Sequence, residues 1–251
     1  MYEIRICQFR LYTYQYSIKT LTAKLTSKDY LPAVAGNPIR ALLDGVIARQ
    51  AALVAHWLLV GFIHGVMNTD NMSVAGETID FGPCAFLDTY DPGAVYSSID
   101  QQGRYAYGNQ PRMAQWNLAR LAETLVPLLG EDADTGLKQA QEAIDGFPAL
   151  FEAAYASGLR SKLGFRLSEP DDIDLGQDLL SRMAQGKADF TLTFRGLCQA
   201  AADPSGDGVV RSFFTQPEAY DAWAVRWRTR MARDGGAQVA GRLARRSPLH
   251  I

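Results

Sequence analysis

The stretch from His64 to Pro83 contains three polar residues whose types and spacing could carry out phosphoryl or nucleotidyl transfer. Asp70 and Asn71 stand together in a loop that begins at His64, and Asp80 follows in the sequence Asp-Phe-Gly. Kinase-like enzymes place a carboxylate near the attacking hydroxyl, and they hold metal ions with a loop Asn and the Asp of a DFG sequence. The order of these residues therefore predicts a site for a nucleotide phosphate and a metal ion.

One position departs from the ordinary kinase pattern. Kinases carry Asp two residues after the loop histidine, but this chain has Val66 there, which can neither accept a proton nor bind a metal ion. A carboxylate reappears at Asp70, so the same loop can still provide a general base. We predict an altered site in which Asp70 is the catalytic base and Asn71 and Asp80 are metal ligands.

Each of these residues also has a structural interpretation. We expect His64 to hold the loop through a backbone hydrogen bond, because the histidine of kinase loops is architectural. Asp70 is of a type that often caps turns, and purely structural roles for Asn71 and Asp80 are the alternative to metal binding.

Hydrophobic patterns predict the elements that position this loop. Apolar residues recur at helical spacing from Ile39 to about Val60, so a long helix leads into His64. Residues 72–74 and 78–80 flank Gly76, which predicts a short β-hairpin between Asn71 and Asp80. Residues 91–111 lack periodicity and predict an ordered surface loop of functional length.

The remainder of the chain has the periodicity of a helical protein. Pro111 begins a helix that continues to Leu128 and ends at Gly130. Residues 2–20 show only a weak strand pattern. The other predicted helices span residues 134–157, with a division at Gly146-Phe-Pro148, and residues 172–186, 189–202 and 216–233.

Four motifs in this chain resemble the selenoprotein O family of protein adenylyltransferases. They are Gly61-Phe-Ile-His-Gly-Val-Met-Asn-Thr-Asp-Asn-Met-Ser73, Thr78-Ile-Asp-Phe-Gly-Pro83, Gln102-Gly-Arg-Tyr-Ala-Tyr-Gly-Asn-Gln-Pro111 and Trp116-Asn-Leu-Ala-Arg-Leu-Ala122. The resemblance is strong over residues 28–130 and continues with less distinctive helices to about residue 233.

The resemblance implies a kinase-like fold that binds ATP in a flipped orientation and transfers AMP to Ser, Thr or Tyr hydroxyls of other proteins. Asp70 resembles the catalytic base of that family, and Asn71 and Asp80 resemble its Mg²⁺ ligands, with Mn²⁺ as an alternative metal ion. We therefore expect a mainly α (α+β) fold, namely the large carboxy-terminal lobe of a kinase-like fold with a small β-hairpin at the metal site. The expected divisions are residues 1–29, a weakly defined segment; 30–233, the lobe; and 234–251, a basic tail.

The residues with which the family holds its nucleotide are not recognisable in this chain. Only 63 residues precede His64, and they contain no Gly-rich loop and a single glutamate, Glu3. The nucleotide-binding residues of the small lobe therefore stay unassigned, and we expect a truncated or split enzyme. The alternative is a catalytically inactive remnant that acts as a helical interaction module.

The family resemblance also brings a redox question. Some members pair a carboxy-terminal Cys or selenocysteine with a Cys near the metal loop, and that loop position falls at about Tyr96 here. The chain has Cys7, Cys84 and Cys198, which are far apart in sequence and have no metal-binding spacing. We expect reduced thiols in a cytoplasmic protein, with Cys84 as a small core residue.

The overall charge and hydropathy restrict the partners. A net charge of -2 and a pI near 5.9 argue against nucleic acid as a partner, and no apolar run predicts a signal peptide or a membrane span. A local exception is the arginine-rich segment 223–246, in which only Asp234 opposes the basic residues: it could contact nucleic acid or an acidic partner, although arginines on an exposed helix usually form a solvated face. The stretch Asp203–Gly208 imitates the start of an EF-hand loop, but Phe214 stands where the bidentate Glu is needed, so we expect a polar turn.

Overall fold

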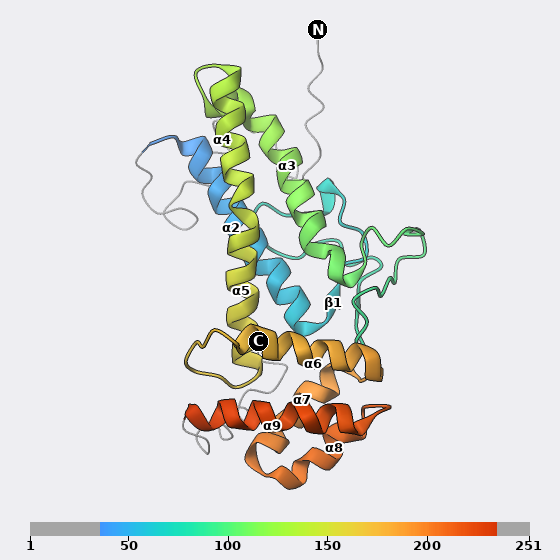
Figure 1. The fold of residues 1–251 in the computed structure, drawn as a ribbon. Helices are drawn as coiled ribbons and strands as arrows, with labels where there is room; N and C mark the ends of the chain where they lie inside the picture. The colour runs from blue at the N-terminus through green and yellow to red at the C-terminus, as the bar shows by residue number, and fades with distance from the viewer. Residues whose placement is uncertain (1–35, 235–251) are drawn as a thin grey trace.

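The computed structural model of the chain describes residues 36–234, and within that range the protein is mainly helical (Figure 1). The helices and strands are α2 (Pro38–Val60), β1 (Phe62–Ile63), β2 (Ala85–Phe86), α3 (Gln110–Leu129), α4 (Ala133–Asp145), α5 (Phe147–Lys162), α6 (Asp172–Gly186), α7 (Phe190–Ala202), α8 (Asp207–Arg211) and α9 (Pro217–Arg233). The weak strands expected within residues 2–20 lie outside the described residues.

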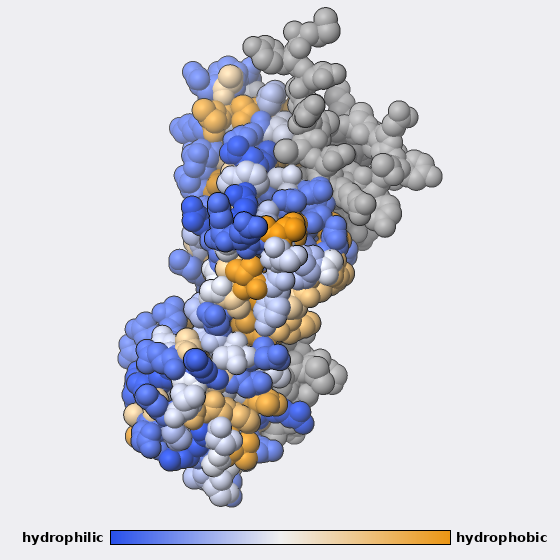
Figure 2. Space-filling view, turned by 90° about the vertical axis from the view of Figure 1, so that its right-hand side faces the viewer, coloured by the Kyte–Doolittle hydropathy of each residue, from blue (hydrophilic) through white to orange (hydrophobic). Residues whose placement is uncertain are grey.

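The helices form two groups, each with its own hydrophobic core. Helices α2 to α5 run side by side, and α6 to α9 cross beneath them (Figure 1). One core joins α2, α3 and α4, and the other joins the carboxy-terminal end of α5 to α6, α7 and α9. In the space-filling view the molecule narrows between the two groups, and hydrophobic residues reach the surface there (Figure 2).

Helix α2 is the central element of the first group. Its start is fixed by Asn37, whose side chain accepts hydrogen bonds from two backbone N–H groups of the first turn, and it ends at Gly61 in the left-handed conformation. By length and composition alone it could cross a membrane. In this fold, however, it packs against α3 and α5, and Leu43, Val46 and Val54 on it are fully buried. Helix α2 is thus a core helix that delivers the chain to His64.

Most of the predicted helices are confirmed within a few residues. The helix predicted for residues 134–157 divides into α4 and α5 at Gly146, as the Gly-Phe-Pro sequence indicated, and α5 continues to Lys162. Helix α8 was not predicted, because its five residues are too few to show a period. It follows a single turn of 3-10 helix, Pro204–Gly206, within the stretch that imitates an EF-hand.

The β-structure is smaller than predicted and lies partly elsewhere. The expected hairpin over residues 72–80 is reduced to one antiparallel bridge, Met72 to Thr78, around a turn at Gly76. Gly76 has φ 76°, and a Cβ there would lie 2.6 Å from the Cβ of Arg49, so a side chain is excluded. The two-stranded sheet is formed by β1 and β2, which lie before His64 and after Pro83 and hold together the two ends of the predicted site.

The second group of helices is held by buried aromatic side chains. The rings of Trp223 and Trp227 stack with centroids 5.4 Å apart, and neither residue is exposed. Their indole N–H groups donate to the backbone carbonyls of Leu175 and Leu163, at 2.8 and 3.0 Å. Each polar indole group therefore has a partner, so burial of these large rings is wholly favourable.

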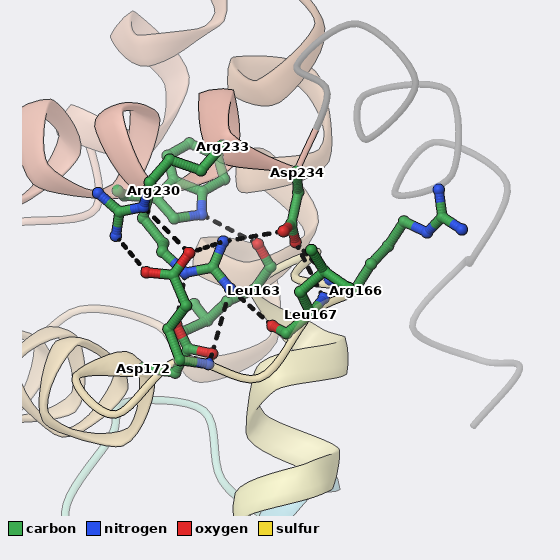
Figure 3. Close-up of polar contacts among 9 residues, drawn as sticks. Leu163, Arg166, Leu167, Asp172, Arg230, Arg233 and Asp234 are labelled. Atoms are coloured by element: carbon green, nitrogen blue, oxygen red, sulfur yellow. Dashed lines mark hydrogen bonds and ion pairs between the residues drawn. The ribbon is translucent and has the colours of Figure 1, made fainter.

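The arginines of α9 do not form the free basic patch that the sequence suggested. Arg230 is buried; its Nε donates to Asp172 at 2.6 Å, and its Nη1 lies 3.0 Å from Asp234 (Figure 3). The other arginines of the helix also have acidic partners: Arg226 pairs with Asp178, Arg228 with Asp207, and Arg233 with Glu169. Asp178 lies on α6, Asp207 on α8 and Glu169 before α6. All three lie outside residues 223–246, so the charges within that segment do not reveal them.

Candidate functional site

His64 is buried at the start of the loop and joins it to the residue before Asp80. Its Nε2 lies 2.8 Å from the carbonyl oxygen of Ile79. Because a carbonyl can only accept, Nε2 carries the proton. Burial lowers the pKa of His64, against the opposing effects of the Ile79 carbonyl and the Asp80 carboxylate. The imidazole is therefore neutral at pH 7, and the expected architectural role agrees with this geometry.

Buried amide side chains from α3 hold the loop from below. Gln110 accepts from the backbone N–H of His64 at 2.9 Å and donates to the carbonyl of Phe62 at 2.9 Å. About two turns further along the helix, Asn117 donates to the carbonyl of Met67 at 2.9 Å. These bonds satisfy backbone groups that would otherwise be buried without partners. They fix both ends of the segment that precedes Asp70.

Asp70 and Asn71 lie in one turn of 3-10 helix, Thr69–Asn71, at the end of this fixed segment. Both side chains are half-buried. The Nδ2 of Asn71 donates to the carbonyl of Val66 at 3.0 Å, across the loop. This bond uses an N–H group of the amide and leaves its Oδ1 as an acceptor.

Asp80 is exposed and has φ 56°, in the left-handed region that residues other than glycine rarely adopt. Such a conformation persists only where the surrounding structure imposes it, and it is common in functional sites. Gly65, with φ 85°, lets the loop approach the segment after Asp80, because a Cβ at Gly65 would lie 2.7 Å from the carbonyl oxygen of Pro83. The loop and the Asp-Phe-Gly segment are thus held side by side.

The structure places Asp70 and Asn71, both half-buried, in one turn of the loop and the exposed Asp80 on the segment held beside it, and it adds four supporting residues that sequence reasoning missed. Trp57 donates from its indole to the hydroxyl of Thr78 at 2.9 Å, and Tyr105 donates from its hydroxyl to Asn68 at 2.7 Å. Together with Gln110 and Asn117, they are separated from their partners by 21 to 50 residues. Three of the four, Tyr105, Gln110 and Asn117, lie in motifs that carried the family resemblance, but no local pattern gives their roles.

Cys84 lies just after the Asp-Phe-Gly-Pro segment. It is half-buried against the first core, and its Sγ lies 3.2 Å from the carbonyl oxygen of Phe81. It is therefore at the edge of the core, less enclosed than expected. The neighbouring rings of Phe81 and Phe86 are 60% and 61% exposed.

The model of the family described as "Protein adenylyltransferase SelO" matches residues 3–249 of this chain. The chain belongs to the SelO family. Among curated SelO relatives, the protein nucleotidyltransferase YdiU of Rhodopseudomonas palustris (strain TIE-1) is 57% identical over 232 residues, which cover 89% of this chain and 47% of that protein. YdiU of Methylorubrum extorquens (strain PA1) is 54% identical over 250 residues, covering 96% and 50%.

A third SelO relative, YdiU of Bradyrhizobium diazoefficiens, is 56% identical over 218 residues, which cover 86% of this chain and 44% of the relative. The chain thus spans about half the length of the curated relatives it matches. SelO family membership is established for the chain, and the resemblance inferred from the four motifs is confirmed.

Proposed function

We propose that this chain provides the catalytic loop and metal-binding face of a protein adenylyltransferase, which transfers AMP from ATP to Ser, Thr or Tyr hydroxyls of proteins. One observation carries the proposal: Asp70, Asn71 and Asp80 keep accessible side chains on a loop whose backbone is held by buried groups. A rigid support with accessible polar groups is what catalysis by positioning requires. The family name and the names of the relatives agree with this chemistry.

The order of the elements supports a kinase-like large lobe. A long core helix, α2, is followed by the loop at His64, by the bridge of Met72 with Thr78, and then by Asp80-Phe-Gly. Kinase-like enzymes use the same order of helix, catalytic loop, small hairpin and metal-binding Asp. We assign residues 64–82 to these parts on that basis.

The donor atoms at this face fit Mg²⁺, and Mn²⁺ would use the same ones. The carboxylates of Asp70 and Asp80 and the Oδ1 of Asn71, whose Nδ2 is bonded to Val66, are hard oxygen donors, and Mg²⁺ is held by one or two carboxylates together with substrate phosphates. Within residues 36–234 no cluster of three or more His, Cys, Asp or Glu residues surrounds a metal position, so phosphate oxygens would complete the coordination. We propose Asn71 and Asp80 as the protein ligands; a bound metal ion neutralises charge on the phosphates.

Asp70 is the proposed general base. Its carboxylate would accept the proton of the substrate hydroxyl as that oxygen attacks the α-phosphorus of ATP and pyrophosphate leaves. Val66 cannot take this role, and His64 is buried with its Nε2 proton committed to Ile79. Because ATP is the substrate and the described cysteines are free thiols, we propose that the protein acts in the cytoplasm.

The proposal is tested by incubating the chain with α-labelled ATP, Mg²⁺ and a generic protein substrate, alone and with the amino-terminal segment of a YdiU relative supplied. Label should transfer to protein, and Asp80→Ala should lower the rate by about a hundredfold or more, as loss of a group that stabilises the transition state does. The matched control is Asp88→Ala, which removes an exposed carboxylate just after β2 and should leave the rate unchanged.

The same test distinguishes the enzyme from the alternative, an inactive helical interaction module. No transfer by the intact chain, even with the supplied segment, would overturn the enzyme proposal. If Asp80→Ala and Asp88→Ala lower the transfer rate equally, the transferase proposal would stand but the proposed metal role of Asp80 would be contradicted.

A further inference from the structure

A basic and aromatic surface lies beside the proposed catalytic loop. Arg112, Trp116 and Arg120 follow one another at intervals of four residues on α3, so they share one stripe of the helix. The guanidinium of Arg104, from the preceding loop, covers the Trp116 ring at 4.8 Å from its centroid, and that of Arg120 lies at 5.4 Å. We call these four residues the Arg–Trp face.

The Arg–Trp face is connected to the catalytic loop through one hydrogen bond. Tyr105 follows Arg104 in the chain, and its hydroxyl donates to Asn68 at 2.7 Å. Asn68 lies two residues before Asp70. The same helix that carries the face also supports the loop, because Asn117 is the neighbour of Trp116 and holds the carbonyl of Met67. The face is therefore joined to the loop at residues 67 and 68, shortly before the proposed base.

The charges of the Arg–Trp face are incompletely balanced within the described residues. Arg120 pairs with Glu123, on the next turn of α3. The carboxylate of Asp100 accepts from the backbone N–H groups of Arg104 and Tyr105, so it is committed to shaping the loop. Within residues 36–234 no ion pair is formed by Arg104 or Arg112, and both are exposed.

These arginines are not explained by helix stability. Arg112 lies in the first turn of α3, where a cation opposes the helix dipole and where no acidic residue stands. Trp116 remains 41% exposed although tryptophan is usually buried. Stacking on the indole holds the Arg104 guanidinium in place while its N–H donors stay free for a carboxylate.

We propose that the Arg–Trp face binds an acidic segment of the protein substrate, with Asp or Glu side chains near the hydroxyl that receives AMP. This inference rests on the function proposed above, because the bound segment is a substrate only if the chain takes part in AMP transfer. Planar guanidinium groups bind carboxylates through paired hydrogen bonds. Two such groups beside the base would select hydroxyls in an acidic sequence over those in a neutral one.

Binding is tested without nucleotide, so that the result does not depend on AMP transfer. A fluorescent peptide with a Tyr flanked by Glu residues is titrated with the 251-residue chain, and its affinity is compared with that of the same peptide with Gln for Glu. We expect the acidic peptide to bind more tightly, and Arg104→Gln with Arg112→Gln to weaken it about tenfold, since two charge-assisted contacts are lost. Arg195→Gln, which removes an exposed arginine of α7, is the matched control and should change nothing.

Other results of this experiment would contradict either the inference or the proposed function. Equal affinity for the Glu and Gln peptides, or equal losses for the double variant and Arg195→Gln, would overturn the inference, even if AMP transfer is observed. An oligonucleotide that binds more tightly than the acidic peptide and depends on Arg104 would also overturn it, in favour of a nucleic-acid surface. In the transfer assay, the double variant should raise KM for an acidic substrate and leave kcat unchanged. Absence of transfer together with intact peptide binding would instead contradict the proposed function.

Discussion

The face around the catalytic loop and the group of helices α6 to α9 use similar residue types in opposite ways. In the helical group Trp223 and Trp227 are fully buried, and Arg230 is enclosed by acidic partners. At the loop face, Trp116 and Phe81 remain exposed, and Arg104 lies on a ring with no acidic partner among the described residues. In the helical group these indole and guanidinium groups have partners within the fold, whereas at the loop face they stay available for ligands.

The difference has a physical reason. Buried charges and indole groups are stable only when each has a partner, so a region that stabilises the fold must complete its hydrogen bonds internally. A site for nucleotide, metal ion and protein must instead keep donors and acceptors open, and it depends on its support for rigidity. Here the support comes from Gln110 and Asn117 on α3, and the open groups stand above it.

The largest expected effect tests the buried side of this comparison. Trp227→Ala should lower the free energy of unfolding by about 3–5 kcal/mol, because it removes a large buried ring and leaves a cavity. Trp116→Ala, at the loop face, should cost less than about 1 kcal/mol, since that ring is partly exposed. Chemical denaturation followed by circular dichroism measures both; similar losses for the two variants would contradict the division into a stabilising region and an open face.

The next effect compares two arginines of the same helix. Arg230→Ala should cost about 3 kcal/mol, because it leaves Asp172 and Asp234 buried without their cation. Arg226→Ala removes an exposed partner of Asp178 and should cost less than about 1 kcal/mol. Denaturation at low and high salt distinguishes them further, since only the exposed pair should weaken with salt. A salt-dependent loss for Arg230 would show that its network is open to solvent.

The smallest expected effect concerns Lys162, which lies between the two regions. Its ammonium group donates to the carbonyl of Leu59 on α2 at 2.5 Å and lies over the rings of Phe190 and Phe194 on α7. Burial lowers the pKa of Lys162 to about 7. Above that pH the unfolded chain binds more protons at this lysine than the folded chain does, so stability should rise with pH, by up to about 1.4 kcal/mol per unit.

This slope is measured as the free energy of unfolding at intervals between about pH 7 and pH 9, below the titration of lysines in the unfolded chain. Lys162→Met keeps the length of the side chain and removes the charge, so it should flatten the slope. Lys187→Met, at the exposed end of α6, is the control and should retain it. A slope that survives in Lys162→Met must arise from another group.

The sequence by itself determined the helices, their order and the residues of the candidate site. Helical spacing of apolar residues, Pro at first turns and Gly at ends are local properties, so α2, α3, α6, α7 and α9 followed from them within a few residues. The site residues followed from motif order, and the family resemblance from the same motifs. The predicted division into residues 1–29, 30–233 and 234–251 stays a prediction, although Asp234 itself packs into the network of Arg230.

Only the tertiary structure decided how those residues are held and which charges are free. The arginines of α9 form a basic patch in the sequence, but in the structure each has an acidic partner, and most of these acids lie far away along the chain. The hairpin predicted before Asp80 is a single bridge, and the sheet that brackets the loop pairs β1 with β2, beyond Pro83. Supporting bonds from Gln110 and Asn117 span 46 and 50 residues. Contacts at that separation depend on how helices pack, which local patterns do not encode.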